Sequence, residues 1–168
     1  MALGMYAASV PMLKTLLNAL SNVLDKGAAF AEAKKIDQTV LTSDRLAPDM
    51  FALSRQVQVA TDMAKGGVAR LAGVEVPAYE DTETTFEQLK ARIAKTVAFI
   101  DSFTPAQIDG SEDKTVVLKM RSGDVSFTGQ RYLIGFVIPN VTFHCTTAYN
   151  ILRHNGVDVG KKDFLGAY

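Results

Sequence analysis

Four long segments of this sequence place apolar residues at every third or fourth position, and that spacing constrains the fold more than any other feature. Residues spaced in this way lie on one face of an α-helix and bury it against other elements. In the first segment we expect Ser9 to cap the helix, Pro11 to lie in its first turn and Gly27 to end it. The apolar positions of this segment are Leu13, Leu16, Leu17, Leu20, Val23 and Leu24.

The second and third segments carry boundary signals of their own. Pro48 or Asp49 opens the second helix, because an acidic residue in a first turn suits the helix dipole, and the stripe continues to Gly73. The third helix begins at a capping box, in which two side chains three residues apart satisfy free backbone N–H groups. Two pairs have that spacing, namely Thr84 with Glu87 and Thr85 with Gln88.

The fourth segment predicts a bent helix. It runs from about Gln130 to His154, and the pair Asn155-Gly156 follows as a stop signal. Pro139 lies inside it. A proline ring clashes with the carbonyl four residues back and leaves that carbonyl without an N–H donor. The carbonyl belongs to Gly135, so we expect a kink with a free Gly135 carbonyl.

Residues 115–128 change from helical spacing to alternation around a turn that contains glycine. This pattern predicts a β-hairpin, and two strands alone are only marginally stable. The hairpin should therefore be covered by the helices or by a second subunit. Its apolar residues are Val116, Leu118, Met120, Val125 and Phe127. The sequence predicts a mainly α fold, a four-helix bundle with a small hairpin before the last helix, as one domain over residues 1–168.

Composition argues against several classes of partner. Lysine plus arginine equals aspartate plus glutamate at 18 each, with the charges interspersed, so we expect no nucleic-acid partner. The longest uncharged apolar stretch, around "YLIGFVIP", falls well short of the roughly 20 residues that span a bilayer, so we expect no membrane partner. The N-terminal residues do not have the pattern of a secretory signal. A lone cysteine forms no internal disulfide, and we expect a cytoplasmic protein.

Residues that carry chemistry are few, and His144 is the most informative of them. Asn140 lies four residues earlier, so on a helix both side chains share one face and could hold one ligand or water molecule. Cys145 points about 100° away from His144, so we expect it to be a buried small hydrophobic residue rather than a nucleophile. His154 lies about 15 Å further along the axis, too far to share a metal ion with His144.

The second helix offers polar residues on two flanks of its apolar stripe. Gln58 and Asp62 are four residues apart and share one flank, whereas Gln56 lies on the opposite flank. Which flank faces the interior is left open by the sequence. A buried polar cluster must be hydrogen-bonded, either within the protein or to a ligand. A packing network and a ligand site are therefore both open interpretations.

Two runs of the sequence resemble a known family. They are "RLAPDMFALSRQVQVATDMAKGGVARLAGVEVPAYEDTETTFEQL" and "TAYNILRHNGVDVGKKDFLG". Both resemble the DUF1993 family of bacterial proteins, which is grouped with the DinB/YfiT-like superfamily of proposed metalloenzymes. The resemblance implies a DinB-like four-helix bundle. In metal-binding relatives, one histidine of the second helix and an H-x-x-x-H pair of the fourth hold zinc or nickel, and these relatives include thiol-dependent transferases and isomerases.

The resemblance places three side chains of this sequence at the metal-ligand positions. His144 matches the second histidine of the pair, Asn140 matches the first, and Gln56 or Gln58 stands nearest the ligand of the second helix. Amides are weak donors to divalent transition metals, so we expect no metal and no other cofactor, with zinc or nickel as the lesser alternative. Asp49 and Asp62 are the carboxylates placed to help in that case.

These observations lead to one functional hypothesis and one alternative. The hypothesis is a DinB-like protein with a polar pocket near His144 and Asn140, without the metal triad, that binds a small molecule or has a structural role. The alternative is a metal- or thiol-dependent transferase-like or isomerase-like enzyme at the same pocket, with His144 as ligand or base. We expect a homodimer formed through a helical face.

Overall fold

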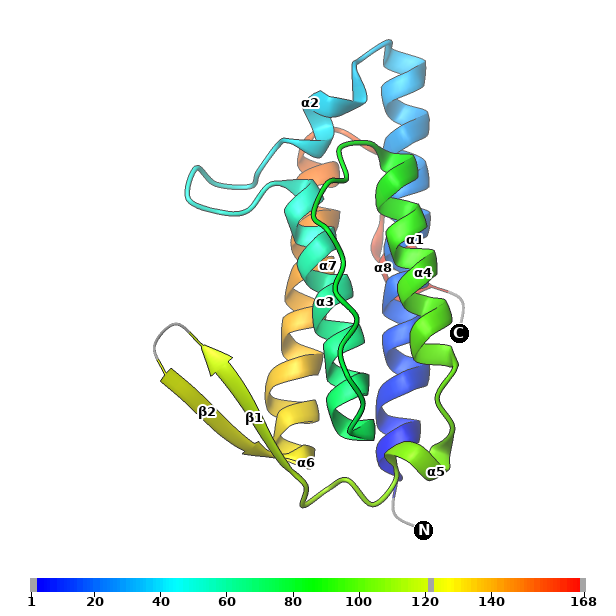
Figure 1. Cartoon of the computed structure of the whole chain (residues 1–168). Coiled ribbons are helices and arrows are strands. Elements are labelled where there is room, and N and C mark those ends of the chain that lie inside the picture. The colour runs from blue at the N-terminus through cyan, green and yellow to red at the C-terminus, as the bar shows by residue number, and fades with distance from the viewer. Residues whose placement is uncertain (1–2, 121–122, 167–168) are drawn as a thin grey trace.

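In residues 3–120 and 123–166, which the computed structural model describes, four long helices lie side by side (Figure 1). They are α1 (Met5–Lys34), α3 (Leu53–Ala72), α4 (Phe86–Asp101) and α7 (Ile138–His154). The short helices are α2 (Gln38–Thr42), α5 (Pro105–Ile108), α6 (Gly129–Tyr132) and α8 (Lys161–Leu165). Strands β1 (Thr115–Met120) and β2 (Gly123–Thr128) precede α6. The predicted fold, mainly helical with a small hairpin before the last long helix, is confirmed.

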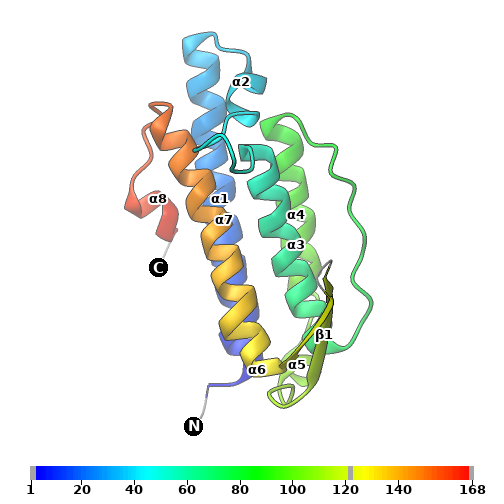
Figure 2. The same ribbon diagram turned by 90° about the vertical axis from the view of Figure 1, so that its left-hand side faces the viewer.

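The directions of the long helices require one long connection. Helices α1 and α7 run one way, whereas α3 and α4 run the opposite way (Figures 1 and 2). Because α3 and α4 are consecutive and run in the same direction, the chain must return along their whole length between them. Residues 73–85 make this return as an extended segment, which we call the strap.

The shared core is built from the predicted apolar stripes. One fully buried side chain from each long helix illustrates it: Leu17 of α1, Val57 of α3, Ile93 of α4 and Val141 of α7. Helix α3 packs against both α4 and α7, and α1 packs against both of these helices as well. Burial of aliphatic side chains of this size contributes roughly 1.5–3 kcal/mol each. Among the residues described, no helix has the length and apolar character needed to cross a bilayer.

Helix α1 is longer at both ends than the sequence indicated. It begins at Met5, so Ser9 is not its cap, and the buried Ser9 hydroxyl donates to the Met5 carbonyl instead. It continues through Gly27 to Lys34, so the expected stop at Gly27 is wrong. Gly27 is small because a Cβ there would lie 3.0 Å from the Phe86 ring. Lys35 follows the last helical residue as its C-cap and has a positive φ of 55°.

The start of α3 is also different from the prediction. Helix α3 begins at Leu53, not at Pro48 or Asp49. The preceding residues form a turn in which the Met50 N–H donates to the Ala47 carbonyl at 3.0 Å. The other boundaries agree with the signals. Gly73 ends α3 with φ 76°, and the Thr85–Gln88 alternative is the capping box of α4.

The fourth predicted helix is present but is irregular where the proline was expected to act. Residues 133–137 form a π-helical segment, η1 (Leu133–Val137), between α6 and α7. The Ile138 N–H donates to the Leu133 carbonyl, five residues back. Pro139 follows in the first turn of α7, so the irregularity lies next to it. The free Gly135 carbonyl stays a prediction.

The hairpin is covered on one side by the helices. Its register pairs Val116 with Phe127 and Leu118 with Val125. Val116 and Leu118 are buried, whereas Val125 is exposed. The half-buried Phe127 ring lies 6.0 Å from the Tyr132 ring and 5.5 Å from that of Phe136. The expected cover therefore comes from the region around α6 and η1, and it is partial.

Phe127→Ala is expected to lower the free energy of unfolding by about 2–3 kcal/mol, less than a fully buried phenylalanine would, because the ring is half-buried. Urea denaturation measures the change. Val125→Ala is the matched control, since Val125 points to the same side of β2 but is exposed, and it should cost less than about 0.5 kcal/mol. A loss below about 1 kcal/mol for Phe127→Ala would show that the hairpin is a peripheral flap.

Candidate functional site

His144 lies on α7 and is hydrogen-bonded across the interior to α3. Its Nδ1 is 2.6 Å from Oε1 of Gln56, and the two side chains are 8% and 1% exposed. Gln56 Nε2 donates to the Phe51 carbonyl at 3.1 Å. The amide oxygen of Gln56 therefore accepts, and Nδ1 of His144 carries the proton that is donated. Gln56, not Gln58, is the residue of the second predicted helix that meets His144.

The other ring nitrogen of His144 is available for chemistry. Among the described residues, the fully buried side-chain nitrogen and oxygen atoms without a hydrogen-bond partner include Ser111 Oγ but not Nε2 of His144. Nε2 of His144 makes no hydrogen bond within the described chain and is not among these buried atoms, so it is at least slightly accessible. Burial, and to a lesser degree the charge of Arg55, lowers the pKa of His144. A neutral imidazole with an open Nε2 can accept a hydrogen bond or a proton.

Asn140 is placed next to His144 but is engaged with its own helix. It is half-buried, and its Nδ2 donates to the Phe136 carbonyl at 2.7 Å. That bond uses a carbonyl at the end of the π-helical segment, where the regular backbone pattern is interrupted. Its Oδ1 remains free to accept from a ligand on the shared face.

Gln58 and Asp62 lie on the opposite flank of α3, facing the strap. Gln58 Nε2 donates to a carboxylate oxygen of Glu83 at 3.0 Å. Asp62 accepts from Arg92 of α4 at 2.9 Å and from Lys65 at 2.9 Å. Both residues thus belong to a charge cluster separate from His144. The structure does not bring them together with Asn140 or Gln56.

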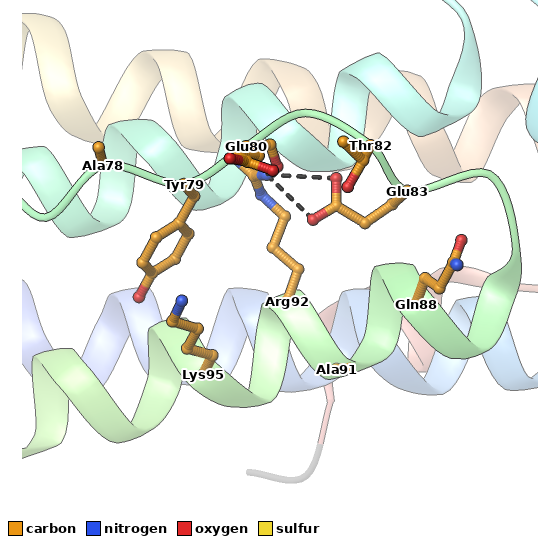
Figure 3. Close-up of a pocket in the computed structure, with 9 residues that line it drawn as sticks. All are labelled: Ala78, Tyr79, Glu80, Thr82, Glu83, Gln88, Ala91, Arg92 and Lys95. Carbon is orange, nitrogen blue, oxygen red and sulfur yellow. Dashed lines mark hydrogen bonds and ion pairs between the residues drawn. The ribbon is translucent and has the colours of Figure 1, made fainter.

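Arg92 is the centre of this cluster, and the sequence reasoning missed it. Its side chain is 2% exposed, and its Nε donates to Thr61 Oγ1 at 2.8 Å. One terminal nitrogen donates to the Glu80 carbonyl at 2.8 Å. The same nitrogen donates to both Glu83 oxygens (Figure 3). The other is paired with Asp62 and, at 3.1 Å, with Asp81. The signal that could have indicated it is the acidic run "YEDTE" in the strap.

Tyr79 of the strap extends the cluster with an aromatic face. Lys65 Nζ lies 3.6 Å and Lys95 Nζ 4.1 Å from its ring centroid, distances at which a cation is attracted to the ring. Burial raises the pKa of Tyr79. Tyr79, Arg92 and Lys95 are among the residues around a cavity of about 500 Å³ between the strap and α4 (Figure 3). Most of the charges here are already paired, so the arrangement fixes the strap.

The remaining candidates do not join the site. Asp49 is exposed, in the turn before α3. Cys145 is buried, and burial raises its pKa to about 12, which keeps the thiol protonated and confirms the expected hydrophobic role. His154 is exposed at the end of α7.

The side chains near His144 do not fit the metal site that the resemblance implies. In the parts of the chain that the structure describes, no group of three or more His, Cys, Asp and Glu side chains could hold a metal ion. The local donors are one imidazole and two amides, and amides are weak ligands for zinc or nickel. Asp62, a carboxylate that the sequence placed near this site, is bonded to Arg92 and Lys65 instead.

Comparisons with known proteins agree with this fold. The family model described as "Domain of unknown function (DUF1993)" matches residues 5–165. The crystal structure of a DinB family member protein from Shewanella denitrificans is similar, with 44% sequence identity and a TM-score of 0.89. The similarity covers 97% of this chain and 92% of that one. No curated protein matches the chain.

Arg92→Met is expected to lower the free energy of unfolding by about 3 kcal/mol, because it leaves three carboxylates and the Glu80 carbonyl without their shared donor. Urea denaturation measures the loss, and limited proteolysis of the strap should become faster as the strap is released. Lys95→Met is the control, since Lys95 is exposed, and it should cost less than about 1 kcal/mol. Equal costs for the two variants would contradict the assigned role of Arg92.

His144 should make stability depend on pH in a defined direction. Its pKa is lower in the folded chain than its ordinary value of 6.5, so below that value the unfolded chain takes up the proton more readily. The folded chain therefore has its full stability, as far as His144 is concerned, above pH 6.5. It loses stability as the pH falls from 6.5 toward the folded pKa of His144. His144→Gln should remove that part of the pH dependence. With two histidines in the chain, the variant also assigns the imidazole NMR signals, and a folded pKa at or above 6.5 would contradict the prediction.

Proposed function

This chain belongs to the DUF1993 family, and we propose that it is a DinB-like binding protein that holds a small molecule at His144 without a resident metal ion. The observation that carries the proposal is the hydrogen bond of 2.6 Å from His144 Nδ1 to Gln56 Oε1. The resemblance puts one metal ligand at His144 and another nearest Gln56 or Gln58. Here the His144 and Gln56 side chains bind each other directly.

The geometry of this bond argues against one metal ion held jointly by Nδ1 of His144 and Oε1 of Gln56. Two ligands of one tetrahedral zinc ion lie roughly 3.3–3.5 Å apart, since each is about 2.0–2.2 Å from the ion. Nδ1 and Oε1 are closer than that. Gln56 is also held by its bond to the Phe51 carbonyl, so its amide is fixed in the position that accepts from His144.

The open nitrogen of His144 indicates the chemistry of the ligand. The neutral imidazole presents Nε2 as an acceptor, so the ligand should offer a donor such as a hydroxyl or an amide N–H. The Phe143 ring meets the imidazole edge to face at 5.2 Å and adds an apolar surface. Phe143 is also exposed, which supports a homodimer through this helix as part of the same proposal.

The second candidate function is an enzyme that uses His144 as a general base. A histidine whose pKa is lowered by burial and whose Nε2 is open is suited to act as a general base near neutral pH. It would take the proton from a thiol or hydroxyl substrate in a transferase-like or isomerase-like reaction. Gln56 orients the ring in place of the carboxylate that commonly does so.

Metal analysis tests whether the site at His144 holds a metal ion. Protein purified without an affinity tag or chelator is expected to contain far less than one zinc or nickel ion per chain. The double variant Gln56→His, Asn140→His supplies three imidazoles with His144 and should bind about one zinc ion per chain. The matched control is Gln58→His, Asn140→His, which should not, because Gln58 faces the strap. Elemental analysis and zinc titration by calorimetry provide the measurements.

Two outcomes of the metal analysis would contradict different parts of the proposal. Stoichiometric zinc or nickel in the unchanged protein, lost in His144→Ala, would overturn the metal-free proposal. Failure of the Gln56→His, Asn140→His variant to gain zinc would remove the argument that these two residues occupy ligand positions. Circular dichroism of each variant excludes a loss of fold as the cause.

A further inference from the structure

A second cavity lies between the hairpin and the end of α3. Its volume is about 470 Å³, within the usual range for small-molecule sites. Met63 and Arg70 of α3 line one side, and residues 117–120 of β1 line another. Arg70 lies 14 positions after Gln56 on α3, which is about 21 Å along the helix axis. The charged end of the cavity is therefore well separated from His144, whereas Phe136, whose carbonyl accepts from Asn140, lies nearer to that site.

The walls of the cavity combine an apolar surface with one cation. Tyr132 and Phe136 line it with rings that are stacked at 5.9 Å, and Leu118 and Met120 of β1 add aliphatic surface. Met120 is 38% exposed, which leaves apolar surface open to a ligand at the mouth. In the described residues β1 pairs with β2 alone, so its second edge also faces away from any strand.

Arg70 has unused binding capacity. A guanidinium carries five N–H donors. In the described residues, the side chain of Arg70 makes one hydrogen bond, from Nη1 to the Tyr132 hydroxyl at 3.1 Å, and no ion pair. Asp62 lines a neighbouring cavity together with Arg70, but this carboxylate is bonded to Lys65 and Arg92. Arg70 is half-buried, so its guanidinium is only partly solvated by water.

The surroundings hold Arg70 in position. Gly66 lies one turn earlier on α3, and a Cβ there would collide with Nη1 of Arg70, so the glycine leaves room for the guanidinium to lie along the helix. Tyr132 is 1% exposed, and its oxygen accepts from Arg70. The phenolic O–H is then free to donate in its turn.

We propose that this cavity binds a small organic anion, a carboxylate on an aromatic or branched aliphatic body. Arg70 holds the carboxylate through its free N–H groups, with the fork geometry that suits a two-oxygen acceptor. The Tyr132 hydroxyl donates to one of the same oxygens, and burial keeps this phenol protonated by raising its pKa. Phe136, Leu118 and Met120 contact the apolar body. Lys119 at the cavity adds a further positive charge.

The test uses benzoate and 4-methylpentanoate as probes and benzamide as the neutral counterpart of benzoate. Isothermal titration calorimetry in a buffer without organic anions should show one benzoate per chain, with a dissociation constant of about 10 µM to 1 mM. Benzamide should bind at least about tenfold more weakly. The 4-methylpentanoate probe reports whether an aliphatic body is accepted as well as an aromatic one.

Variants assign the binding to the named residues. Arg70→Gln should weaken benzoate at least about tenfold but leave benzamide unchanged. Tyr132→Phe keeps the ring and removes the hydroxyl, so it should weaken benzoate by a smaller factor. Arg153→Gln is the matched control, because Arg153 is an exposed arginine of α7 that is paired with Asp158. His144→Gln should have no effect, which separates this site from the proposed function. Thermal melting confirms that each variant is folded.

Three outcomes would overturn the proposal. They are equal affinities for benzoate and benzamide, undiminished benzoate binding by Arg70→Gln, and no binding of any probe up to about 10 mM. A second copy of the chain is the other partner that could bind this apolar surface. Sedimentation velocity tests it by measuring the oligomeric state. A dimer that dissociates in Met120→Asp would assign the cavity to that copy and not to a small anion.

Discussion

The burial of one guanidinium, that of Arg92, is the interaction on which the arrangement of the helices depends. Helices α3 and α4 run in the same direction, so the strap must return along them as extended backbone with few hydrogen bonds of its own. Arg92 binds the Glu80 carbonyl and the carboxylates of Asp81 and Glu83 at successive points of the strap. A charge this deeply buried is tolerated only when it is fully paired, and it therefore specifies one position for the strap.

The strap covers one flank of α3, so only polar residues on the other flank of this helix can contribute to a site at His144. Gln58 and Asp62 are used to hold strap and helix together, so they are not free to serve a ligand. Gln56 faces α7 instead, where it meets His144. The family resemblance located this pair but could not say which glutamine was involved. That choice depends on which flank the strap covers, and the sequence pattern of α3 alone does not contain it.

Local signals predicted the local features well. Helical spacing identified the four long helices, and the capping box and Gly73 placed two of their ends, because each of these features depends on residues within one or two turns. Gly27 was misread because its reason lies elsewhere: it makes room for Phe86, 59 positions away in the sequence. Arg92 was missed for the same kind of reason, since its partners come from α3 and from the strap. Gly27 and Arg92 are thus explained by tertiary contacts with distant residues, and such contacts override the local signals for helix ends.

The same helix that separates the two flanks also separates the two proposed sites. Gln56 lies in the first turn of α3 and Arg70 in the last, about 21 Å apart along a rigid element. At His144 the neutral imidazole offers an acceptor, whereas at the hairpin the guanidinium offers donors and a positive charge. The two sites therefore select opposite partners, a hydrogen-bond donor at one and an anion at the other. A single molecule that joined both would need a donor at one end and an anion at the other, and a length that matched the helix between them.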